Sequence, residues 1–440
     1  MGTTTEQTAG RPAATTTLLR FATAGSVDDG KSTLVGRLLY DSKSVLADQM
    51  QAVEHASRSR GRDAPDLALL TDGLRAEREQ GITIDVAHRY FATPRRRFIL
   101  ADSPGHEQYT RNMVTGTSTA ELTVILVDAR KGMVEQTRRH AAIAALLRVP
   151  HVVLAVNKMD LVGHEESVFA RIAVEFTRYA AELGAGEITA IPVSALAGDN
   201  VVEPSANMDW YGGPTVLEHL ETVPAGADPG GRQARFPVQY VIRPQTAGHP
   251  DYRGYAGQIA AGTLHVGESV TVLPSGRETT VAAIDALGVR VPSASAPESV
   301  TVLLADDLDV ARGDLIVPAG AAPGLTRRVE ATVCHLHDRP LTVGAHVLLK
   351  HTTRTVRASV GELPYRIDTA HGLTRLPRPQ SLRANDIGTV VLHTSEPLPM
   401  DGYADSRRTG SFLLIDPADG ATLTAGMAGA AFADGCGGGR

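Results

Sequence analysis

Short apolar runs alternate with amphipathic stretches over the first half of the chain. The runs predict strands, and they are Leu19 to Ala24, Phe98 to Asp102, Thr123 to Asp128, Val152 to Asn157 and Ile188 to Ser194. Stretches such as Thr33 to Tyr40 and Val134 to Leu147 predict helices between them. Alternation of this kind is typical of a parallel sheet with helices on both faces.

The pattern changes after Trp210. The stretch Pro224 to Arg232 is rich in Pro, Gly and Ala, and short β-branched runs then recur between Gly, Pro and Asp turns. This predicts two β-barrels, with glycine turns in Gly257 to Glu268 of the first and a break near Ala319 to Leu325 before the second. The strand runs of the second barrel are Val329 to His335, His346 to His351 and Thr389 to His393.

Composition predicts a cytoplasmic enzyme of about three domains, at roughly 150 residues each. The chain has 440 residues, 42% of them hydrophobic, and only two cysteines, so no disulfide framework is expected. No apolar run approaches a membrane span, and Met1 to Thr17 is expected to be a disordered lead. The net charge is −6 without a basic block, which argues against a chain whose main task is to grip RNA.

A phosphate-binding loop is predicted between the first strand and the first helix. The pattern G-x-x-x-x-G-K-[ST] is matched by Gly25, Ser26, Val27, Asp28, Asp29, Gly30, Lys31 and Ser32, followed by Thr33. Its N–H groups and the helix N-terminus attract phosphate, Lys31 can reach the outer phosphates, and Ser32 can ligate Mg²⁺. Without its strand and helix, the octapeptide would be about as readily explained as an ordinary turn.

A second motif selects the base. Asn157, Lys158, Met159 and Asp160 follow an apolar strand, which places them on the same sheet edge as the phosphate loop. One carboxylate can accept both the N1–H and the N2–H₂ of guanine, so Asp160 predicts GTP rather than ATP. Asn157 would hold the opposite base edge and brace the loop, and Lys158 would lie along the base plane. The backbone of Ser194, Ala195 and Leu196 would close over the guanine oxygen; taken alone, Asn-Lys-x-Asp would be read as a polar turn.

Two further boxes complete the expected site. Asp102, Ser103, Pro104, Gly105 and His106 end a strand, where Asp102 can hold Mg²⁺ through water and the Gly105 amide can sense the γ-phosphate. Thr83, in Gly81 to Asp85, can close on the metal when GTP is bound. The predicted metal ligands are therefore Ser32, Thr83 and Asp102.

With these boxes in order, the chain resembles the translational GTPase superfamily and, within it, the large GTP-hydrolysing subunit of bacterial sulfate adenylyltransferase. The stretches that carry this resemblance are Gly25 to Thr33, Leu38 to Lys43, Asp72 to Asp85, Arg243-Pro244 and Asp251 to Tyr255. It extends from about Leu19 to the last barrel. Asp29 stands where the superfamily usually has His, Ser103 stands where the family commonly has Thr, and Gln245 to Pro250 is longer than usual.

The resemblance implies a GTPase that works with a partner chain. In this family a small subunit carries the ATP and sulfate site, and GTP hydrolysis by the large subunit drives formation of adenosine 5′-phosphosulfate and pyrophosphate. The implied cofactors are GTP and Mg²⁺, the implied partner is the small ATP-binding subunit, and neither a membrane nor a nucleic acid is expected. The catalytic residues would be Lys31, Thr83 and His106, which is carried over from the Asp-x-Pro-Gly-His box to orient the water; the alternative for His106 is a side chain that only packs against the switch.

The expected architecture is an α/β P-loop GTPase domain followed by two β-barrel domains. Its predicted ranges are a disordered lead at 1–17, the GTPase domain at 18–230, the barrels at 231–322 and 323–434, and a flexible tail at 435–440.

Two other functions compete with this interpretation. One is a translation factor that delivers aminoacyl-tRNA, and the other is a regulatory GTP switch without coupled transfer. A fused adenylylsulfate kinase is not expected, because no second phosphate loop occurs in the sequence.

Three local patterns receive simpler interpretations. Cys334 to His337 alternates like a strand, which favours a barrel wall over a metal site. The run Arg95-Arg96-Arg97 is expected to be a solvated hairpin turn. The charged stretch Arg75 to Gln80 abuts Thr83 and is expected to become ordered with GTP.

Overall fold

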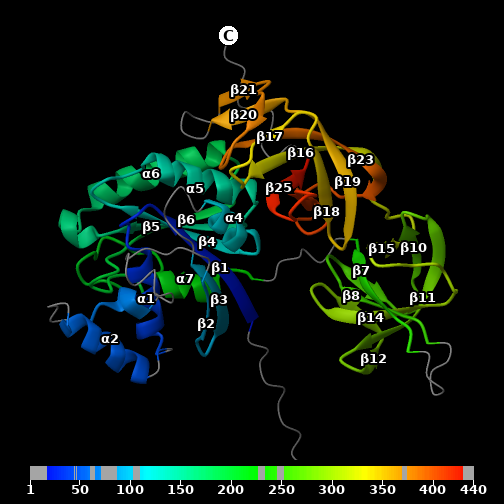
Figure 1. The fold of residues 1–440 in the computed structure, drawn as a ribbon. Helices are drawn as coiled ribbons and strands as arrows, with labels where there is room; N and C mark the ends of the chain where they lie inside the picture. Colours follow the sequence, from blue (N-terminus) through cyan, green and yellow to red (C-terminus); the bar gives the residue numbers. More distant parts are fainter. Residues whose placement is uncertain are drawn as a thin grey trace, which may run out of the picture.

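The computed structural model describes residues 17–43, 45, 47–59, 65–70, 87–102, 110–225, 233–244, 252–368 and 374–429 (Figure 1). The predicted lead lies outside this part except for Thr17, which begins the first strand. The tail from Gly435, the stretch Arg75 to Gln80 and the loop Gln245 to Pro250 also lie outside the described residues.

A six-stranded sheet forms the first module. Its order is β2-β3-β1-β4-β5-β6. The apolar runs correctly predicted β1, β3, β4, β5 and β6, whereas the edge strand β2 was missed, because only Phe91 of its six residues is buried. Only β2 is antiparallel to its neighbour, and the other pairs are parallel. The strands are β1 (Thr17–Gly25), β2 (Ala87–Ala92), β3 (Arg96–Asp102), β4 (Leu122–Asp128), β5 (His151–Asn157) and β6 (Glu187–Pro192).

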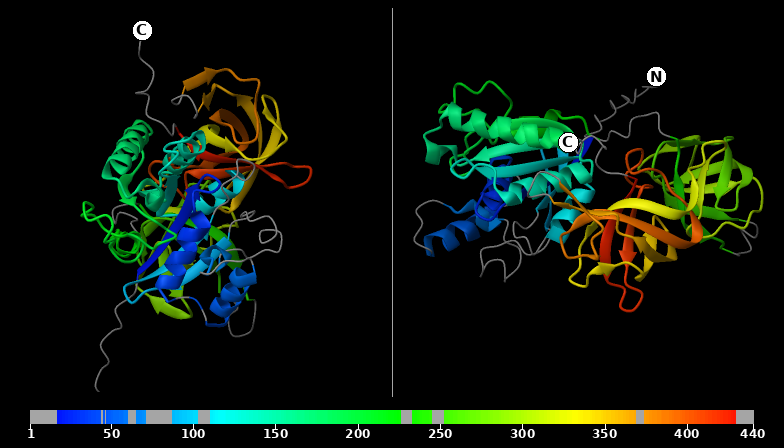
Figure 2. Two further views of the ribbon diagram at one scale, coloured as in Figure 1. Left: turned by 90° about the vertical axis from the view of Figure 1, so that its left-hand side faces the viewer. Right: turned by 90° about the horizontal axis from the view of Figure 1, so that it is seen from above.

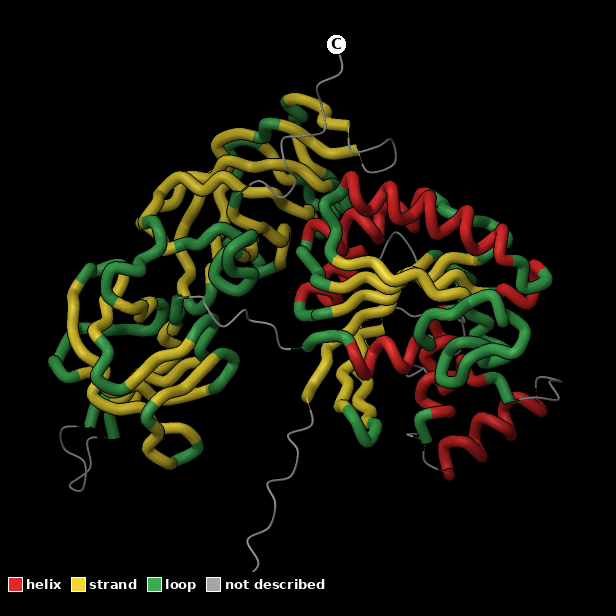
Figure 3. Tube along the Cα trace, turned by 180° about the vertical axis from the view of Figure 1, so that it is seen from behind, coloured by secondary structure: helices red, strands yellow, loops and turns green. Residues whose placement is uncertain are grey.

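Helices cover both faces of this sheet because successive strand residues point to opposite sides (Figure 3). In β5, Leu154 and Val156 join the core on the side of α5 and α6, and Val153 and Ala155 join the core under α1 and α7. The helices are α1 (Lys31–Asp41), α2 (Ala47–Ser59), α4 (Thr110–Ser118), α5 (Glu135–Leu146), α6 (Glu166–Glu182) and α7 (Val216–Thr222), with short 3₁₀ turns η1 (Leu67–Leu70) and η3 (Met159–Val162). Within the described residues, no helix is both long and apolar enough to cross a bilayer.

The first barrel follows the Pro- and Gly-rich stretch. Its ring runs β10-β15-β7-β8-β14-β11, and the pairing of β10 with β11 closes it. Phe236, Val270 and Ile284 are among the fully buried residues of its core. The strands are β7 (Phe236–Ile242), β8 (Gly254–Gln258), β9 (Thr263–His265), β10 (Ser269–Leu273), β11 (Arg277–Ala286), β12 (Val289–Val291), β13 (Ser293–Ser295), β14 (Ser299–Leu304) and β15 (Leu315–Pro318).

The second barrel begins after a break of six residues, Ala319 to Gly324. Its ring runs β16-β25-β24-β18-β19-β23, and the pairing of β16 with β23 closes it. The strands are β16 (Leu325–His335), β17 (Leu341–Thr342), β18 (His346–His351), β19 (Arg354–Glu362), β20 (Tyr365–Asp368), β21 (Thr374–Pro377), β22 (Ser381–Leu382), β23 (Ile387–Pro399), β24 (Ser411–Ile415) and β25 (Thr422–Ala428). Cys334 is buried in the wall of this barrel, as expected, and the predicted fold class is confirmed.

The second barrel lies between the other two modules (Figure 2). On one side, the Tyr403 hydroxyl donates to the Leu147 carbonyl just after α5 at 3.0 Å. Arg407 donates to the carbonyls of Ser118 and Ala120 at the end of α4, at 2.8 and 3.1 Å. On the other side, a bidentate pair joins Arg235 of the first barrel to Asp401 at 2.9 Å for both bonds.

The expectation for the arginine run is wrong for Arg96. Arg95 and Arg97 are exposed, whereas Arg96 is 7% exposed and crosses to the C-terminal end of α7. Its Nη1 donates to the carbonyls of Leu220 and Val223 at 2.9 and 2.6 Å, and its Nε donates to the Thr17 hydroxyl at 3.0 Å. A cation is favourable at this end of a helix, where carbonyls lack intrahelical partners.

Replacing Arg96 with Met should therefore destabilise the first module. The variant keeps the apolar stem but leaves two α7 carbonyls without their buried donor, at a cost of about 2–3 kcal/mol. Urea unfolding followed by circular dichroism measures the change. Arg97→Met on the exposed face is the matched control, and an equal loss of stability in both variants contradicts the capping role.

Candidate nucleotide-binding site

The predicted phosphate loop lies between β1 and α1, at the carboxyl edge of the sheet (Figure 1). Asp28 and Gly30 have φ angles of 66° and 94°, so the backbone turns sharply before the helix. A Cβ on Gly30 would lie 2.3 Å from Nδ2 of Asn157. Glycine is required at this position both for the positive φ and for the approach of that amide.

Lys31 lies under the loop with its side chain almost fully buried. Its Nζ donates to the carbonyls of Gly25 and Ser26 at 2.8 and 2.9 Å. Burial lowers the pKa of Lys31, and the nearby carboxylates of Asp102 and Asp29 oppose that shift. The ammonium is thus held beside the loop, where a phosphate group would meet it.

Asp29 points into the loop rather than into solvent. Its carboxylate accepts the N–H of Ser26 at 2.7 Å, and 2% of the residue is exposed. Burial raises the pKa of this carboxyl, against the hydrogen bond from Ser26 and the charge of Lys31. The residue that departs from the superfamily pattern therefore braces the loop from inside.

Asn157 connects the phosphate loop to the base-binding segments. Its Nδ2 donates to the Asp29 carbonyl at 2.7 Å, and its Oδ1 accepts the N–H of Ala195 at 2.9 Å. Both ends of the amide are engaged by backbone, which agrees with the expected bracing.

Asp160 lies at the start of η3, beside Asn157. Its Oδ1 is buried and has no hydrogen-bond partner among the described residues. A buried carboxylate oxygen without a donor is costly, so its position calls for an external donor. The two N–H groups of a guanine edge are suitable donors for a carboxylate at this place.

The segment Ser194 to Leu196 lies next to Asn157, which accepts one of its N–H groups. The N–H of Ser194 donates to the Asp199 carbonyl at 3.2 Å, and the N–H of Ala195 is taken by Asn157. Among the described residues, no acceptor contacts the Leu196 N–H, so this N–H is available to an external acceptor. The Leu196 side chain is exposed.

The remaining predicted residues are placed only in part. Asp102 ends β3, is buried, and accepts a hydrogen bond from the Thr23 hydroxyl at 2.7 Å. Ser32 lies in the first turn of α1. Thr83, Ser103, Pro104, Gly105 and His106 lie outside the described residues.

The described donors fit Mg²⁺. The Asp102 carboxylate and the Ser32 hydroxyl are hard oxygen ligands, and Mg²⁺ is usually bound by one or two carboxylates together with phosphate oxygens. The described part of the chain holds no cluster of three His, Cys, Asp or Glu side chains. Such a cluster is not needed for a metal that a nucleotide would bring.

Sequence reasoning missed Asp128, at the end of β4. Its carboxylate contacts Nζ of Lys158 at 3.0 Å and Arg130 at 2.6 Å. Burial acts to raise the pKa of Asp128, but these hydrogen bonds outweigh it and hold the pKa below its usual range. Lys158 also donates to the Asp28 carbonyl, so Asp128 orients a motif lysine across the phosphate loop. The sequence did offer one signal for Asp128: it is an acidic residue at the end of a predicted strand, between the phosphate loop and the Asn157 motif.

Arg37 was also missed. It lies on α1 and reaches the base-binding segment, where its Nε donates to the Ala195 carbonyl at 3.3 Å and its Nη2 donates to the Leu196 carbonyl. Its Nη1 lies 3.7 Å from Asp41, one turn along the helix. No sequence motif marks this arginine, because the two carbonyls that it binds in the base-binding segment are more than 150 residues away.

Comparison with known proteins agrees with this geometry. The family model described as the elongation factor Tu GTP binding domain matches residues 16–225, and the model described as GTP-eEF1A C-terminal domain-like matches residues 328–428. The first match covers both motifs of the site and supports GTP as the nucleotide.

Three curated relatives match nearly the whole chain. Sulfate adenylyltransferase subunit 1 of Yersinia pseudotuberculosis is 48% identical over 93% of this chain and 85% of its own length. The bifunctional enzyme CysN/CysC of Mycobacterium tuberculosis is 55% identical over 94% of this chain and 67% of its own length. The bifunctional enzyme NodQ of a Rhizobium species is 47% identical over 93% and 63%, so the chain spans about two thirds of the two bifunctional relatives.

The Arg37 contacts predict a role in nucleotide affinity. In Arg37→Ala the base-binding segment loses its two bonds to α1, and the KM for GTP should rise about tenfold while kcat stays nearly constant, because the phosphate loop is intact. Steady-state GTP hydrolysis by the full chain measures both constants. Arg171→Ala, on the exposed face of α6, is the control, and an unchanged KM in Arg37→Ala contradicts the role.

Proposed function

Since the chain belongs to the family of sulfate adenylyltransferase subunit 1, we propose that it hydrolyses GTP to drive the adenylyl transfer from ATP to sulfate on a partner subunit. The products of that transfer are adenosine 5′-phosphosulfate and pyrophosphate. The chain is therefore an enzyme subunit of sulfate activation with a GTP-binding domain of the elongation-factor type.

One observation carries this proposal. A relative named sulfate adenylyltransferase subunit 1 aligns with 93% of this chain at 48% identity, across the nucleotide domain and both barrels. An elongation factor that delivers aminoacyl-tRNA is less favoured, because the relatives that match nearly the whole chain carry sulfate adenylyltransferase or bifunctional names.

Coupling has a chemical reason. The phosphosulfate anhydride is a high-energy product, and a sulfate oxygen is a poor nucleophile, so forward transfer is unfavourable without a second exergonic step. GTP hydrolysis is such a step. Hydrolysis itself depends mainly on positioning and on charge stabilisation.

The described residues support a division of roles in hydrolysis. Lys31 is held beside the loop and would offset charge on the β and γ oxygens, while the backbone N–H groups of Gly25 to Ser32 would cradle the phosphates. Asp160 would accept the two guanine donors with its buried oxygen. His106 would orient the attacking water, as carried over from the family box.

Mg²⁺ would be held by Ser32, Asp102 and, when GTP is bound, Thr83. Bound there, it would neutralise charge on the β and γ oxygens of GTP. Ser32 lies in the first turn of α1, which follows β1, and Asp102 ends β3, the parallel neighbour of β1. Both residues thus lie at the carboxyl edge of the sheet, which supports this assignment.

A partner subunit is implied by the family name, since a subunit 1 works with another subunit. We assign that partner the ATP and sulfate site. The bifunctional relatives are longer than the region that they share with this chain, and their additional activity is not assigned to it.

Coupling is tested with the full chain and its ATP-binding subunit. ATP and sulfate together should accelerate GTP turnover, and Lys31→Ala should reduce that turnover about 100-fold because the β and γ phosphates lose a fixed charge. Release of phosphate from GTP and formation of adenosine 5′-phosphosulfate are measured in parallel. Lys350→Ala, exposed on β18, is the control. Adenosine 5′-phosphosulfate formation that is equally fast without GTP rules the coupling out.

Base selection is tested by changing one oxygen of the site. Asp160→Asn should lose affinity for GTP and gain affinity for xanthosine triphosphate, because the amide donates where the carboxylate accepts. A reversal of preference of about 100-fold is expected, since a mismatched buried hydrogen-bond pair is strongly penalised. Competition binding of the two nucleotides provides the readout, and retained guanine selectivity contradicts the role of Asp160.

A further inference from the structure

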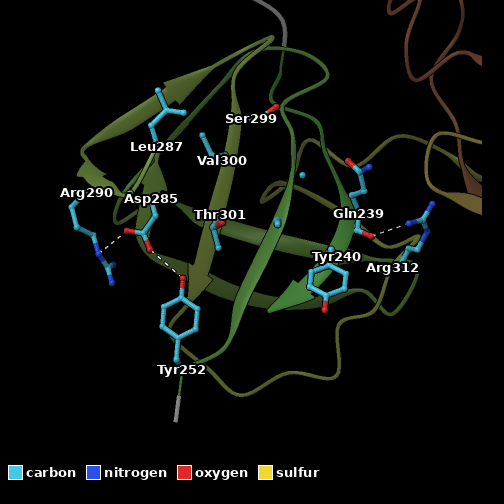
Figure 4. A pocket seen from close by; sticks show the side chains of 13 residues that line it. Gln239, Tyr240, Tyr252, Asp285, Leu287, Arg290, Ser299, Val300, Thr301 and Arg312 are labelled. Carbon is cyan, nitrogen blue, oxygen red and sulfur yellow. Dashed lines mark hydrogen bonds and ion pairs between the residues drawn. The ribbon is translucent and has the colours of Figure 1, made fainter. Parts of the chain in front are cut away.

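The outer face of the first barrel has a wide hollow that the nucleotide site does not use. Its volume is about 810 Å³, and it is lined by residues of β7, β8, β14, β11 and β12 (Figure 4). Strands β7, β8, β14 and β11 each pair with a neighbour on both sides, so their backbone hydrogen bonds are already made. A ligand in the hollow would therefore meet side chains rather than free backbone groups.

The shape of the hollow follows from one row of cross-strand neighbours. Tyr240 of β7 faces Ala256 of β8, which faces Thr301 of β14, and Thr301 in turn faces Asp285 of β11, which faces Arg290 of β12. Small side chains occupy the middle of the row and large ones occupy its ends. The result is a groove that runs along β8 and β14, and an extended chain fits such a shape better than a compact ligand does.

An exposed apolar side chain stands at one wall of this groove. Leu287 is fully exposed, and its backbone has a φ of 49° at the tip of the β11–β12 hairpin, followed by Gly288 at 80°. Two positive φ angles define a turn that favours Asn-Gly, and a bulky residue there is disfavoured. A leucine that is exposed at the edge of a hollow, in a turn that favours asparagine, offers an apolar contact to another molecule.

A second apolar side chain lines the groove. Tyr240 is 65% exposed on the opposite wall. Tyrosine at the wall of a groove is typical of protein interfaces.

Arginines flank the groove on its two sides (Figure 4). The Nε of Arg290 forms an ion pair with the Asp285 carboxylate at 2.8 Å. Asp285 also accepts a hydrogen bond from the Tyr252 hydroxyl at 3.2 Å. Arg312 donates to the Gln239 carbonyl at 3.3 Å and is exposed. With two guanidinium groups and one carboxylate that is already satisfied, the lining carries an excess of positive charge on a chain whose net charge is −6.

We propose that this groove binds an extended acidic segment of the ATP-binding partner subunit. Apolar side chains of the segment pack on Leu287 and Tyr240, and its carboxylates pair with Arg290 and Arg312. The identity of the occupant rests on the proposed function, which requires a partner, and its chemistry rests on the charge and shape of the groove.

The test uses the full chain and measures its affinity for the purified ATP-binding subunit. Leu287→Asn places the preferred residue in the hairpin turn, so its Tm should be equal to or above that of the parent chain. Arg312→Glu reverses one charge of the rim. Both variants should bind the subunit at least about tenfold more weakly, while GTP hydrolysis by the isolated chain stays unchanged.

Matched controls lie away from the groove. Val343→Asn changes an exposed apolar residue that also precedes a turn glycine, in the second barrel, and Arg277→Glu reverses an exposed charge on the first barrel. Both should bind the subunit as the parent chain does.

Three results overturn the proposal. Parental affinity in Leu287→Asn and Arg312→Glu excludes the groove as the contact, and equal weakening in the controls excludes its specificity. If the isolated chain instead binds ATP at a second site that Leu287→Asn removes, the occupant is a nucleotide. A parent chain that hydrolyses GTP but never binds the subunit is a different failure, because it refutes the partnership itself.

Discussion

The nucleotide site depends on one side-chain amide. Asn157 donates to the Asp29 carbonyl and accepts from the Ala195 N–H. A single group at the end of β5 therefore fixes the position of the phosphate loop relative to the base-binding segment. The amide can lie there only because Gly30 has no Cβ. Two segments separated by more than 120 residues therefore share one rigid support. Groups held in this way need little reorganisation when they meet a ligand.

Charged side chains near Asn157 also hold the phosphate loop in place. Lys158 and Lys31 both contact carbonyls of the phosphate loop, and each has carboxylates nearby, Asp128 for the first and Asp102 and Asp29 for the second. A buried ammonium without such partners would be strongly disfavoured. The carboxylates thus stabilise the buried Lys31 and the half-buried Lys158 beside a loop that must attract phosphate.

What could be predicted from the sequence is what the chain encodes locally. Strands β1, β3, β4, β5 and β6, the phosphate loop and the Asn-Lys-x-Asp motif are each encoded by a few consecutive residues, and their order along the chain places the two motifs on one sheet edge. The edge strand β2 was not predicted, because it has no apolar run. Arg37, Asp128 and Arg96 were missed or misinterpreted because their roles depend on distant partners. Arg96 appeared to belong to a solvated turn, yet its acceptors are Leu220 and Val223. Nothing near Arg96 in the sequence distinguishes it from its exposed neighbours, since only the folded position of α7 selects it.

The barrels are joined to the nucleotide domain by polar anchors of the same distant kind. Helix α4 begins soon after the Asp102 box, and its final carbonyls accept hydrogen bonds from Arg407 of the second barrel. Six residues before Arg407, Asp401 forms the bidentate pair with Arg235 of the first barrel, with both side chains about nine-tenths buried. A buried bidentate pair tolerates little change in geometry, because separating its charges leaves each without a partner. The loop from Asp401 to Arg407 therefore ties the end of α4 to the base of the first barrel, and a displacement of α4 must either move the barrels with it or break one of these anchors.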